Sequence, residues 1–241
     1  MIRQDVLMRA MPDSEPIGSD QAVGSDQAVG SDQAVDSAHM PVERAWLARP
    51  ALELAPDVLG AVLVSSSPEG AVAVRITEVE AYEGADDPGS HAFRGRTRRN
   101  EVMFGPAGHL YVYFTYGMHW CANVVCGPPG EASAVLLRAG EVIQGLSVAR
   151  SRRPSARTDN ELARGPARLA STLALGPAHN GLDLCDPDSG LVLRPADGPP
   201  GRISTGPRVG LARAAERPWR YWITGDPTVS RYRPHTPRRR E

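Results

Sequence analysis

The stretch from residue 71 to residue 143 constrains the fold most strongly, because it contains four extended runs, the first followed by a polar loop at 84–100 and the others joined by turns. The first run, AVAVRITEVEAY, is long enough for a strand whose alternate residues share one face. The next two runs flank Gly117-Met118 as the arms of a hairpin do, and GPPGE turns the chain into the fourth. Because turns this short join antiparallel strands, the sequence predicts an antiparallel sheet. The runs cover residues 71–82, 109–116, 119–126 and 133–143.

Helices and shorter strands are expected on both sides of this stretch. Residues 51–64 predict a short helix that runs into a strand, and further helices are expected at 142–152 and 162–174. A last strand is expected in WRYWIT, at 219–224. The sequence therefore predicts a single α+β domain over residues 44–232, built on a curved, mainly antiparallel β-sheet with flanking helices and a protruding β-hairpin.

The two ends of the chain differ in composition from this domain. GSDQAV occurs three times in succession between residues 18 and 35, and the first 43 residues hold two arginines against eight acidic residues. A six-residue period is also found in β-helices, but acidic copies without large apolar side chains have no face to bury. We expect residues 1–43 to be a disordered acidic tail and residues 233–241 a frayed basic C-terminus.

The basic residues limit the chemistry that is available. All 27 are arginine, and the absence of lysine excludes a lysine Schiff base and a Walker-A phosphate clamp. Outside the tail, 25 arginines stand against 20 acidic residues, so the body of the protein is mildly basic. A basic body is compatible with a nucleic-acid partner without requiring one.

Cysteine and hydropathy patterns indicate the compartment. The three cysteines are an odd number and none lies in a CxxC pair, so neither a disulfide scaffold nor a zinc site is expected. No apolar run approaches the ~20 residues of a membrane span, and the first residues lack the apolar region of a secretory signal. We expect a cytoplasmic protein that binds no metal and no organic cofactor and does not associate with a membrane.

Aromatic residues gather in the predicted hairpin. Of the three Phe, six Tyr and four Trp in the chain, six lie between Phe104 and Trp120. In a strand, Tyr111 and Tyr113 share one face, whereas Tyr116 at the tip shares the other. Two interpretations stay open here, namely aromatic cross-strand packing or a platform on which nucleic-acid bases stack.

Glu80 is a second candidate, near the end of the first extended run. It continues the alternating face that runs from Val72 through Ile76 to Tyr82, and burying a carboxylate there costs free energy unless it is paired or protonated. Such a group suits general acid–base catalysis, whereas a strand that has already left the core leaves it solvated. His91, in the next loop, matters only if it points into the same pocket.

Two loops are candidates for phosphate contacts. Four arginines fall within residues 94–99, and GPRVG at 206–210 can present backbone N–H groups to an anion. A solvated loop and an ordinary turn explain the same residues.

Six motifs follow one another in an order and spacing that are specific together. They are EAYEGADDPGSHA (80–92), RTRRNEVMFGPAGHLYVYFTYGMHWCANVV (96–125), VLLRAGE (135–141), ELARGPARLASTLAL (161–175), GPRVGLARA (206–214) and WRYWITGDPTVS (219–230). In these motifs the chain resembles the alkyladenine DNA glycosylases, also called 3-methyladenine DNA glycosylases. The resemblance covers nearly all of residues 44–232, and the acidic tail has no counterpart in it.

The resemblance implies an excision pocket with a role for each residue. Glu80 becomes the general base on the water that attacks C1′ of the damaged nucleotide, and Arg138 supports it. Tyr82 stacks on the flipped base, Tyr113 supplies the opposing wall, and His91 closes the pocket.

Other positions are implied to recognise the lesion and its duplex. Asn123 discriminates against the 2-amino group of guanine, and Tyr116 is the wedge that replaces the flipped nucleotide. Met118, Arg96 and Arg99 are expected to contact the DNA nearby.

The predicted function is therefore that of a monofunctional DNA glycosylase. It flips alkylated purines out of double-stranded DNA, hydrolyses the N-glycosidic bond and leaves an abasic site for base excision repair. We expect it to act as a monomer at the nucleoid, and the absence of lysine agrees with hydrolysis alone. Two rivals remain: a non-catalytic nucleic-acid-binding module, and a glycoside hydrolase that uses carboxylates such as Glu78 and Glu80, roughly 6.6 Å apart along one strand.

Overall fold

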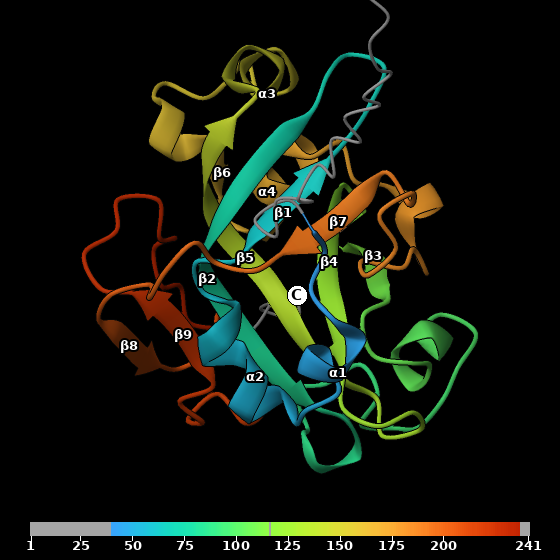
Figure 1. Ribbon diagram of the computed structural model, residues 1–241. Helices are drawn as coiled ribbons and strands as arrows, with labels where there is room; N and C mark the ends of the chain where they lie inside the picture. The colour runs from blue at the N-terminus through green and yellow to red at the C-terminus, as the bar shows by residue number, and fades with distance from the viewer. Residues whose placement is uncertain (1–39, 116, 237–241) are drawn as a thin grey trace, which may run out of the picture. The chain divides into compact units, whose positions relative to one another are not determined.

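The structure, a computed structural model, describes residues 40–115 and 117–236 (Figure 1). Residues 1–39 of the predicted tail and residues 237–241 of the predicted C-terminus lie outside the described residues. The helices are α1 (Arg44–Leu47), α2 (Ala51–Val58), α3 (Leu146–Arg152) and α4 (Pro166–Thr172). The strands are β1 (Val62–Ser65), β2 (Val72–Glu83), β3 (Leu110–Thr115), β4 (His119–Cys126), β5 (Ser133–Gln144), β6 (Ala163–Arg164), β7 (Leu191–Arg194), β8 (Ile203–Gly206) and β9 (Arg220–Ile223).

The strands form one open sheet whose neighbours run antiparallel. The main order is β3-β4-β5-β2-β1-β7, with β6 beside β5, β9 beside β2 and β8 beside β9. The two longest strands, β2 and β5, have 12 residues each and lie side by side across the middle of the sheet (Figure 1). The predicted single α+β domain with a mainly antiparallel sheet is confirmed.

Most predicted elements lie where the sequence pattern places them. The long strand is β2, the hairpin is β3–β4 with Thr115 paired to His119, and WRYWIT contains β9. The helix predicted at 142–152 is too long at its start, because residues 142–144 continue β5. Gly145 then turns the chain with a left-handed φ of 75°, and α3 begins only after it.

The main core packs α2 and α4 against the sheet. In α2 the buried positions recur every three or four residues, which is the stripe of an amphipathic helix. Helix α4 begins with Pro166, whose missing N–H costs nothing at a first helical position. The buried residues of the two helices are Ala51, Leu54, Ala55, Val58, Leu169, Ala170 and Thr172.

A second, smaller cluster lies on the other face of β3, β4 and β5. Because side chains alternate along β3, Leu110 and Val112 enter the main core, whereas Tyr111 and Tyr113 belong to this second cluster. The loop between β2 and β3 covers it with Ala92 and other side chains. The aromatic face predicted for the hairpin is therefore separate from the main core.

A β-bulge shows that the predicted single face from Val72 to Tyr82 is wrong. The pairing of β2 with β5 skips Thr77 on β2 and Arg138 on β5. Since side chains alternate with a period of two, one extra residue moves all later ones to the opposite face. The main core receives Val72, Val74, Ile76, Val79 and Ala81. The opposite face receives Glu78, Glu80 and Tyr82.

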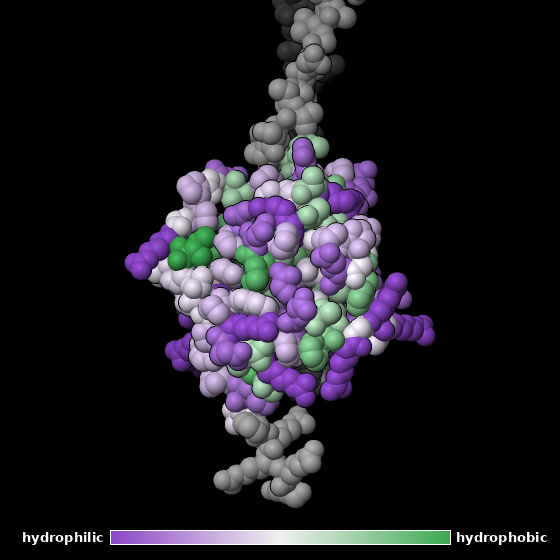
Figure 2. All heavy atoms as spheres, turned by 90° about the horizontal axis from the view of Figure 1, so that it is seen from below, coloured by the Kyte–Doolittle hydropathy of each residue, from purple (hydrophilic) through white to green (hydrophobic). Residues whose placement is uncertain are grey.

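The outer surface mixes hydrophilic and apolar side chains. On the face drawn in Figure 2, the apolar patches are small and separated by hydrophilic residues. Phe114 and Met118, at the end of the β3–β4 hairpin, are 43% and 67% exposed. Among the described residues, no helix combines the length and the apolar character that crossing a membrane requires.

Candidate active site

A cavity of about 380 Å³ opens on the face of the sheet that carries Glu80. Its lining comes from β2, β3, β4 and β5, from the loop between β2 and β3, from the start of α4 and from residues 209–211. We call it the tyrosine pocket, after Tyr82, Tyr111 and Tyr113 in its walls. Six of the residues predicted to form the site meet in it: Glu80, Tyr82, His91, Tyr113, Asn123 and Arg138.

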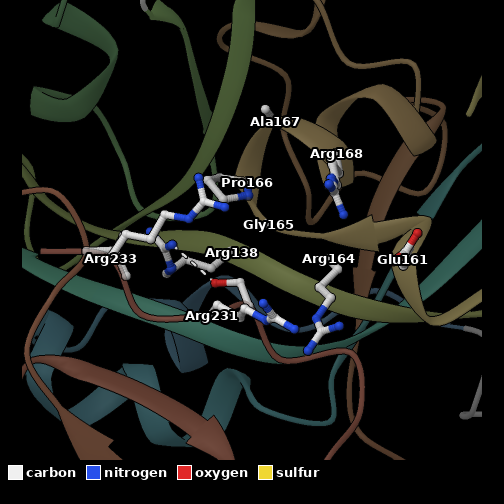
Figure 3. Close-up of a pocket in the computed structure, with 11 residues that line it drawn as sticks. Arg138, Glu161, Arg164, Gly165, Pro166, Ala167, Arg168, Arg231 and Arg233 are labelled. Carbon is white, nitrogen blue, oxygen red and sulfur yellow. Dashed lines mark hydrogen bonds between the residues drawn. The ribbon is translucent and has the colours of Figure 1, made fainter. Parts of the chain in front are cut away.

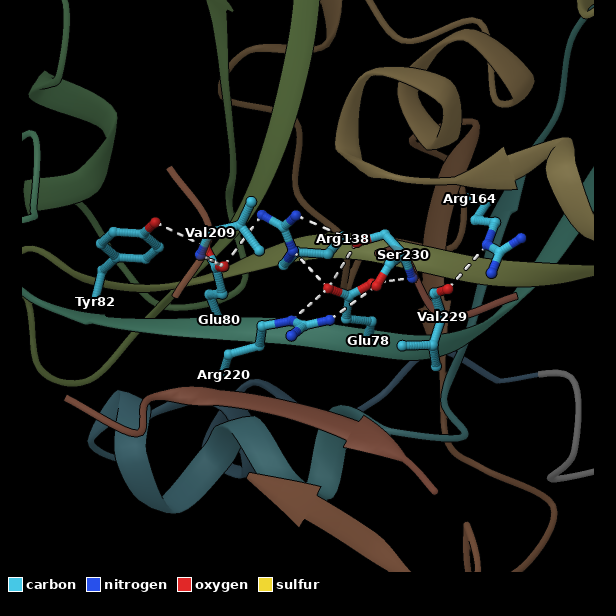
Figure 4. Close-up of polar contacts among 9 residues, drawn as sticks. All are labelled: Glu78, Glu80, Tyr82, Arg138, Arg164, Val209, Arg220, Val229 and Ser230. Atoms are coloured by element: carbon cyan, nitrogen blue, oxygen red, sulfur yellow. Dashed lines mark hydrogen bonds and ion pairs between the residues drawn. The ribbon is translucent and has the colours of Figure 1, made fainter. Parts of the chain in front are cut away.

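Glu80 lies fully buried in the wall of the tyrosine pocket, and three donors hold its carboxylate (Figure 4). Oε2 accepts a hydrogen bond from the Tyr82 hydroxyl at 2.8 Å. Oε1 accepts one from the Val209 N–H at 2.7 Å and pairs with Arg138 Nη1 at 3.1 Å. A carboxylate has about four lone-pair positions, so Oε2 is able to accept one further hydrogen bond.

Glu78, two residues earlier on β2, accepts four hydrogen bonds and lines neither of the two cavities next to β5. Arg138 Nε and Arg220 Nε donate to its Oε1, each at 2.7 Å. Ser230 donates its N–H to Oε2 at 2.7 Å and its hydroxyl to Oε1 at 2.9 Å. Burial raises the pKa of Glu78, but the charges of the two arginines outweigh it and bring the pKa below its ordinary value of 4.5.

These four residues, Glu78, Arg138, Arg220 and Ser230, form what we call the ion cluster. Arg138 is the member that reaches both carboxylates (Figure 4). It is held by Glu78 on one side and approaches Glu80 on the other. The ion cluster therefore fixes the position of the charge that lies beside Glu80.

The wall opposite Glu80's strand is aromatic. The rings of Tyr111 and Tyr113 stack with their centroids 5.5 Å apart, and His91 meets Tyr113 edge-on at 4.5 Å. His91 Nδ1 lies 3.1 Å from the Tyr111 hydroxyl, at the exposed rim of the pocket. Desolvation, followed by the charge of Arg99, lowers the pKa of His91, which favours the neutral ring. The wall presents flat, uncharged rings to the cavity.

A buried stack supports the ring of Tyr82. The guanidinium of Arg208 lies 4.6 Å from the centroid of Tyr82 and 5.0 Å from that of Trp219. Arg208 is also paired with Asp87, and both side chains are fully buried. The sequence interpretation of GPRVG as a turn or a phosphate-binding loop misses this role of Arg208, and the contribution of the Val209 N–H to Glu80. Nothing in the motif marks an arginine that packs inward.

Comparison with known proteins identifies the group to which this site belongs. The family model described as methylpurine-DNA glycosylase (MPG) matches residues 45–227, a span that contains the whole lining of the tyrosine pocket. The chain belongs to this family. The predicted family is therefore confirmed, and with it the enzyme class, a hydrolase that acts as a DNA N-glycosylase.

Individual relatives of the glycosylase are similar over most of its length. A protein of Streptomyces avermitilis is 59% identical over 203 residues, which cover 83% of this chain and 95% of the relative. A protein of Leifsonia xyli subsp. xyli is 55% identical over 203 residues, with 81% and 93% covered. One of Burkholderia lata is 46% identical over 188 residues, with 78% and 89% covered. Each bears the name "Putative 3-methyladenine DNA glycosylase".

Arg96, Arg99 and Met118 of the glycosylase, which were predicted to contact DNA, lie outside the pocket lining. Arg99 Nη2 donates to the Phe114 carbonyl at 3.1 Å, which attaches the arginine loop to the hairpin. Arg96 lies over the ring of Phe104, 6.0 Å from its centroid, and both arginines are exposed. Met118 is exposed at the end of the hairpin. Tyr116, the predicted wedge, lies outside the described residues.

The glycoside hydrolase interpretation requires a second carboxyl across the cavity. Within residues 40–115 and 117–236, Glu80 is the only carboxylate that lines the tyrosine pocket. Glu78 is held in the ion cluster, Asp87 is paired with Arg208, and Asp86 is exposed. No group of three or more His, Cys, Asp or Glu side chains in this part of the chain is placed to hold a metal ion.

Proposed function

We propose that this glycosylase flips 3-methyladenine and related alkylated purines out of double-stranded DNA and hydrolyses their N-glycosidic bond. The observation that carries the proposal is the carboxylate of Glu80, fully buried beside the tyrosine pocket and able to accept one more hydrogen bond. The names of its relatives support 3-methyladenine as a substrate. The tyrosine rings support a planar, electron-poor base as the ligand.

Base flipping is needed because the glycosidic bond that is hydrolysed lies inside the duplex. A glycosidic bond inside a duplex cannot be reached, and extruding the nucleotide costs a few kcal/mol. Stacking on an aromatic side chain returns about 1–3 kcal/mol per base. Tyr82 and Tyr113 stack on the extruded base, and His91 closes the pocket over it. An alkylated purine that carries a positive charge gains further from electron-rich rings.

Glu80 then acts as the general base on a water molecule. The water oxygen bonds to C1′, its proton passes to the carboxylate, and the bond between C1′ and the purine breaks, so that the base leaves. General-base catalysis contributes about 10²–10⁴-fold. Arg138 and the Tyr82 hydroxyl keep the carboxylate oriented, and its negative charge stabilises the developing oxocarbenium ion.

Selection of the base depends on Asn123. Its side chain is 5% exposed, lines the pocket, and donates from Nδ2 to the Tyr111 carbonyl at 3.2 Å. A fixed amide at this place discriminates against the 2-amino group of guanine, because an unmatched polar contact in a buried site is costly.

The hairpin and the arginine loop hold the duplex. Tyr116 is the wedge that takes the place of the flipped nucleotide, and its flanking residues Thr115 and Met118 favour this role. Thr115 lines the pocket, and Met118 is exposed beside it. Arg96 and Arg99 contact the DNA from the neighbouring loop.

The reaction stops at an abasic site. The chain has no lysine, so strand cleavage through a lysine Schiff base is not available and the enzyme is monofunctional. We further propose that it works as a monomer, in the cytoplasm at the nucleoid.

The test is base release from methylated duplex DNA by the purified protein and by Glu80→Gln. We expect the wild type to release free 3-methyladenine and to leave strands that break only after alkaline treatment. The variant is expected to bind DNA and release no base. Equal release by both proteins contradicts the role of Glu80. Binding without release by the wild type favours the non-catalytic binding module.

A further inference from the structure

A second cavity, of about 490 Å³, lies directly beside the tyrosine pocket. The two cavities share Arg138, Pro166, Ala167 and Val209 in their linings, so they are neighbours across one wall. The second cavity lies between the start of α4, β6 and the chain that follows β9. Figure 3 shows the arginine side chains arranged around this space, next to Gly165.

The lining of this cavity carries strong positive charge. Besides Arg138, it includes Arg164, Arg168, Arg231 and Arg233. None of these four has a carboxylate within 4.0 Å among the residues that the structure describes. We call the cavity the arginine channel. Guanidinium groups without a protein counter-charge favour an anionic ligand, and their planar geometry suits phosphate.

One carboxylate, that of Glu161, also lines the arginine channel. Its Oε2 accepts a hydrogen bond from the Arg157 N–H at 3.0 Å. This bond is the main cause that lowers the pKa of Glu161, with the charges of Arg168, Arg157 and Arg164 among the further causes. A single acid that is already engaged leaves the excess of positive charge in place.

The backbone that carries two of these arginines is firmly attached. The Val229 carbonyl accepts from Arg164 Nε at 2.9 Å, and the Ser230 carbonyl accepts from Arg220 at 2.9 Å. The Arg233 carbonyl accepts from the Gly210 N–H at 3.1 Å. Gly210 adjoins Val209, whose own N–H is bonded to Glu80. The channel is therefore held in place by the same loop that orients the catalytic carboxylate.

We propose that the arginine channel binds successive phosphates of the damaged DNA strand, next to the flipped nucleotide. The inference rests on the proposed function, because it assumes that the base enters the tyrosine pocket. A nucleotide extruded into that pocket brings its own strand past Arg138, and the neighbouring cavity supplies the charge that this strand needs. Arg168, Arg231 and Arg233 are exposed, so their side chains are accessible to a phosphate.

The first experiment measures the salt dependence of binding. The probe is a duplex with a stable abasic-site analogue, and the proteins are the wild type, Arg168→Gln/Arg231→Gln and Arg194→Gln/Arg202→Gln. The last variant is the matched control, because Arg194 on β7 and Arg202 before β8 line neither cavity. Each phosphate contact contributes about 0.9 to the slope of log K against log salt. Between about 50 and 200 mM salt, the wild type should therefore lose about tenfold more affinity than the channel variant.

The second experiment locates the phosphates. Neutral methylphosphonates are placed one at a time in either strand of the same duplex. We expect one or two positions in the damaged strand to weaken the wild type and leave the channel variant unaffected. The proposal is overturned if only methylphosphonates in the complementary strand weaken binding by the wild type. It is also overturned if the slope of log K against log salt is the same for the channel variant and the wild type.

Base release is measured on the same protein preparations, so that the two proposals fail separately. Release by the wild type with an unchanged slope in the channel variant rejects the channel and retains the function. A reduced slope with strand-specific coupling, but no release by the wild type, retains the channel as a DNA-binding surface and rejects the function. Melting temperatures of the variants equal to that of the wild type confirm that their folds are intact.

Discussion

The ion cluster and the tyrosine pocket each contain one fully buried carboxylate of β2, but only the carboxylate of Glu80 lines a cavity. Glu78 receives four hydrogen bonds from Arg138, Arg220 and Ser230, three of them on Oε1, and it lines neither cavity. Glu80 is held by Tyr82, Val209 and Arg138, and it lines the tyrosine pocket. Burial alone therefore does not distinguish the two carboxylates; a place in the wall of a cavity does.

The largest effect is expected from Glu80→Gln. Loss of the general base should lower the single-turnover rate of base release by about 10²–10⁴-fold. The melting temperature should fall less than in Glu78→Gln, because Gln has nearly the same shape and both Arg138 and Arg220 keep their contacts with Glu78. Rate and melting curve are measured on the same preparation. A large loss of stability would place Glu80 with Glu78 as a structural residue.

Glu78→Gln should mainly lower the free energy of unfolding. It leaves Arg220 without a paired carboxylate and Arg138 with Glu80 alone, and breaking such a buried ion pair costs about 3–5 kcal/mol of unfolding free energy. Denaturant unfolding measures this loss. Ser230→Ala is the matched control, since it removes a donor but no charge and should cost less. If both variants unfold like the wild type, the ion cluster has no structural role.

The pH dependence of stability separates the two carboxylates further. The pKa of Glu78 in the folded protein lies below its ordinary value of 4.5, so its stabilising effect is complete above that pH and is lost as the pH falls through the folded value. The difference in stability between the wild type and Glu78→Gln should therefore shrink as the pH is lowered below 4.5. Unfolding curves recorded from neutral to acid pH test this. A constant difference contradicts it.

Tyr82→Phe should have the smallest effect. It keeps the aromatic ring and removes the hydroxyl that donates to Glu80 at 2.8 Å. A net loss of about 0.5–1.5 kcal/mol for one hydrogen bond corresponds to about a 2–10-fold lower rate of base release. Binding to DNA with an abasic-site analogue should not change. A rate loss as large as that of Glu80→Gln would assign the hydroxyl a direct part in the chemistry.

Strands β2 to β5 could be predicted from the sequence because they are the longer strands of the sheet and short turns join β3, β4 and β5. Alternation along β3 also separated Tyr111 and Tyr113 correctly from the core-facing Leu110 and Val112. These features depend only on neighbours in the sequence. The bulge at Thr77 does not, because it is defined by the partner strand, and the predicted face from Val72 to Tyr82 was wrong for that reason.

The candidate site was only partly accessible to sequence reasoning. The sequence pattern around Glu80 did not decide whether its carboxylate is buried. A strand that stays in the core and a strand that leaves it at this point have the same alternation of residues. Motif resemblance named six residues that meet in the tyrosine pocket, but it did not indicate Arg208 or Arg220, which act from behind the wall. The arginine channel was missed because Arg168 and Arg231 are far apart in the sequence and only the fold brings them to one cavity.

Because of the bulge in β2, the face on which the Glu80 and Tyr82 side chains lie depends on the number of residues in this strand. Thr77 is the extra residue that shifts Glu80 and Tyr82 by one place in the pleat. A chain shortened by this one residue would aim the carboxylate at aliphatic side chains and present Val79 to the pocket instead. Substitutions weaken one contact at a time, whereas a single-codon deletion here exchanges the two faces of the strand at once. At Thr77 itself, natural variation should therefore accept a change of residue more readily than a change of length.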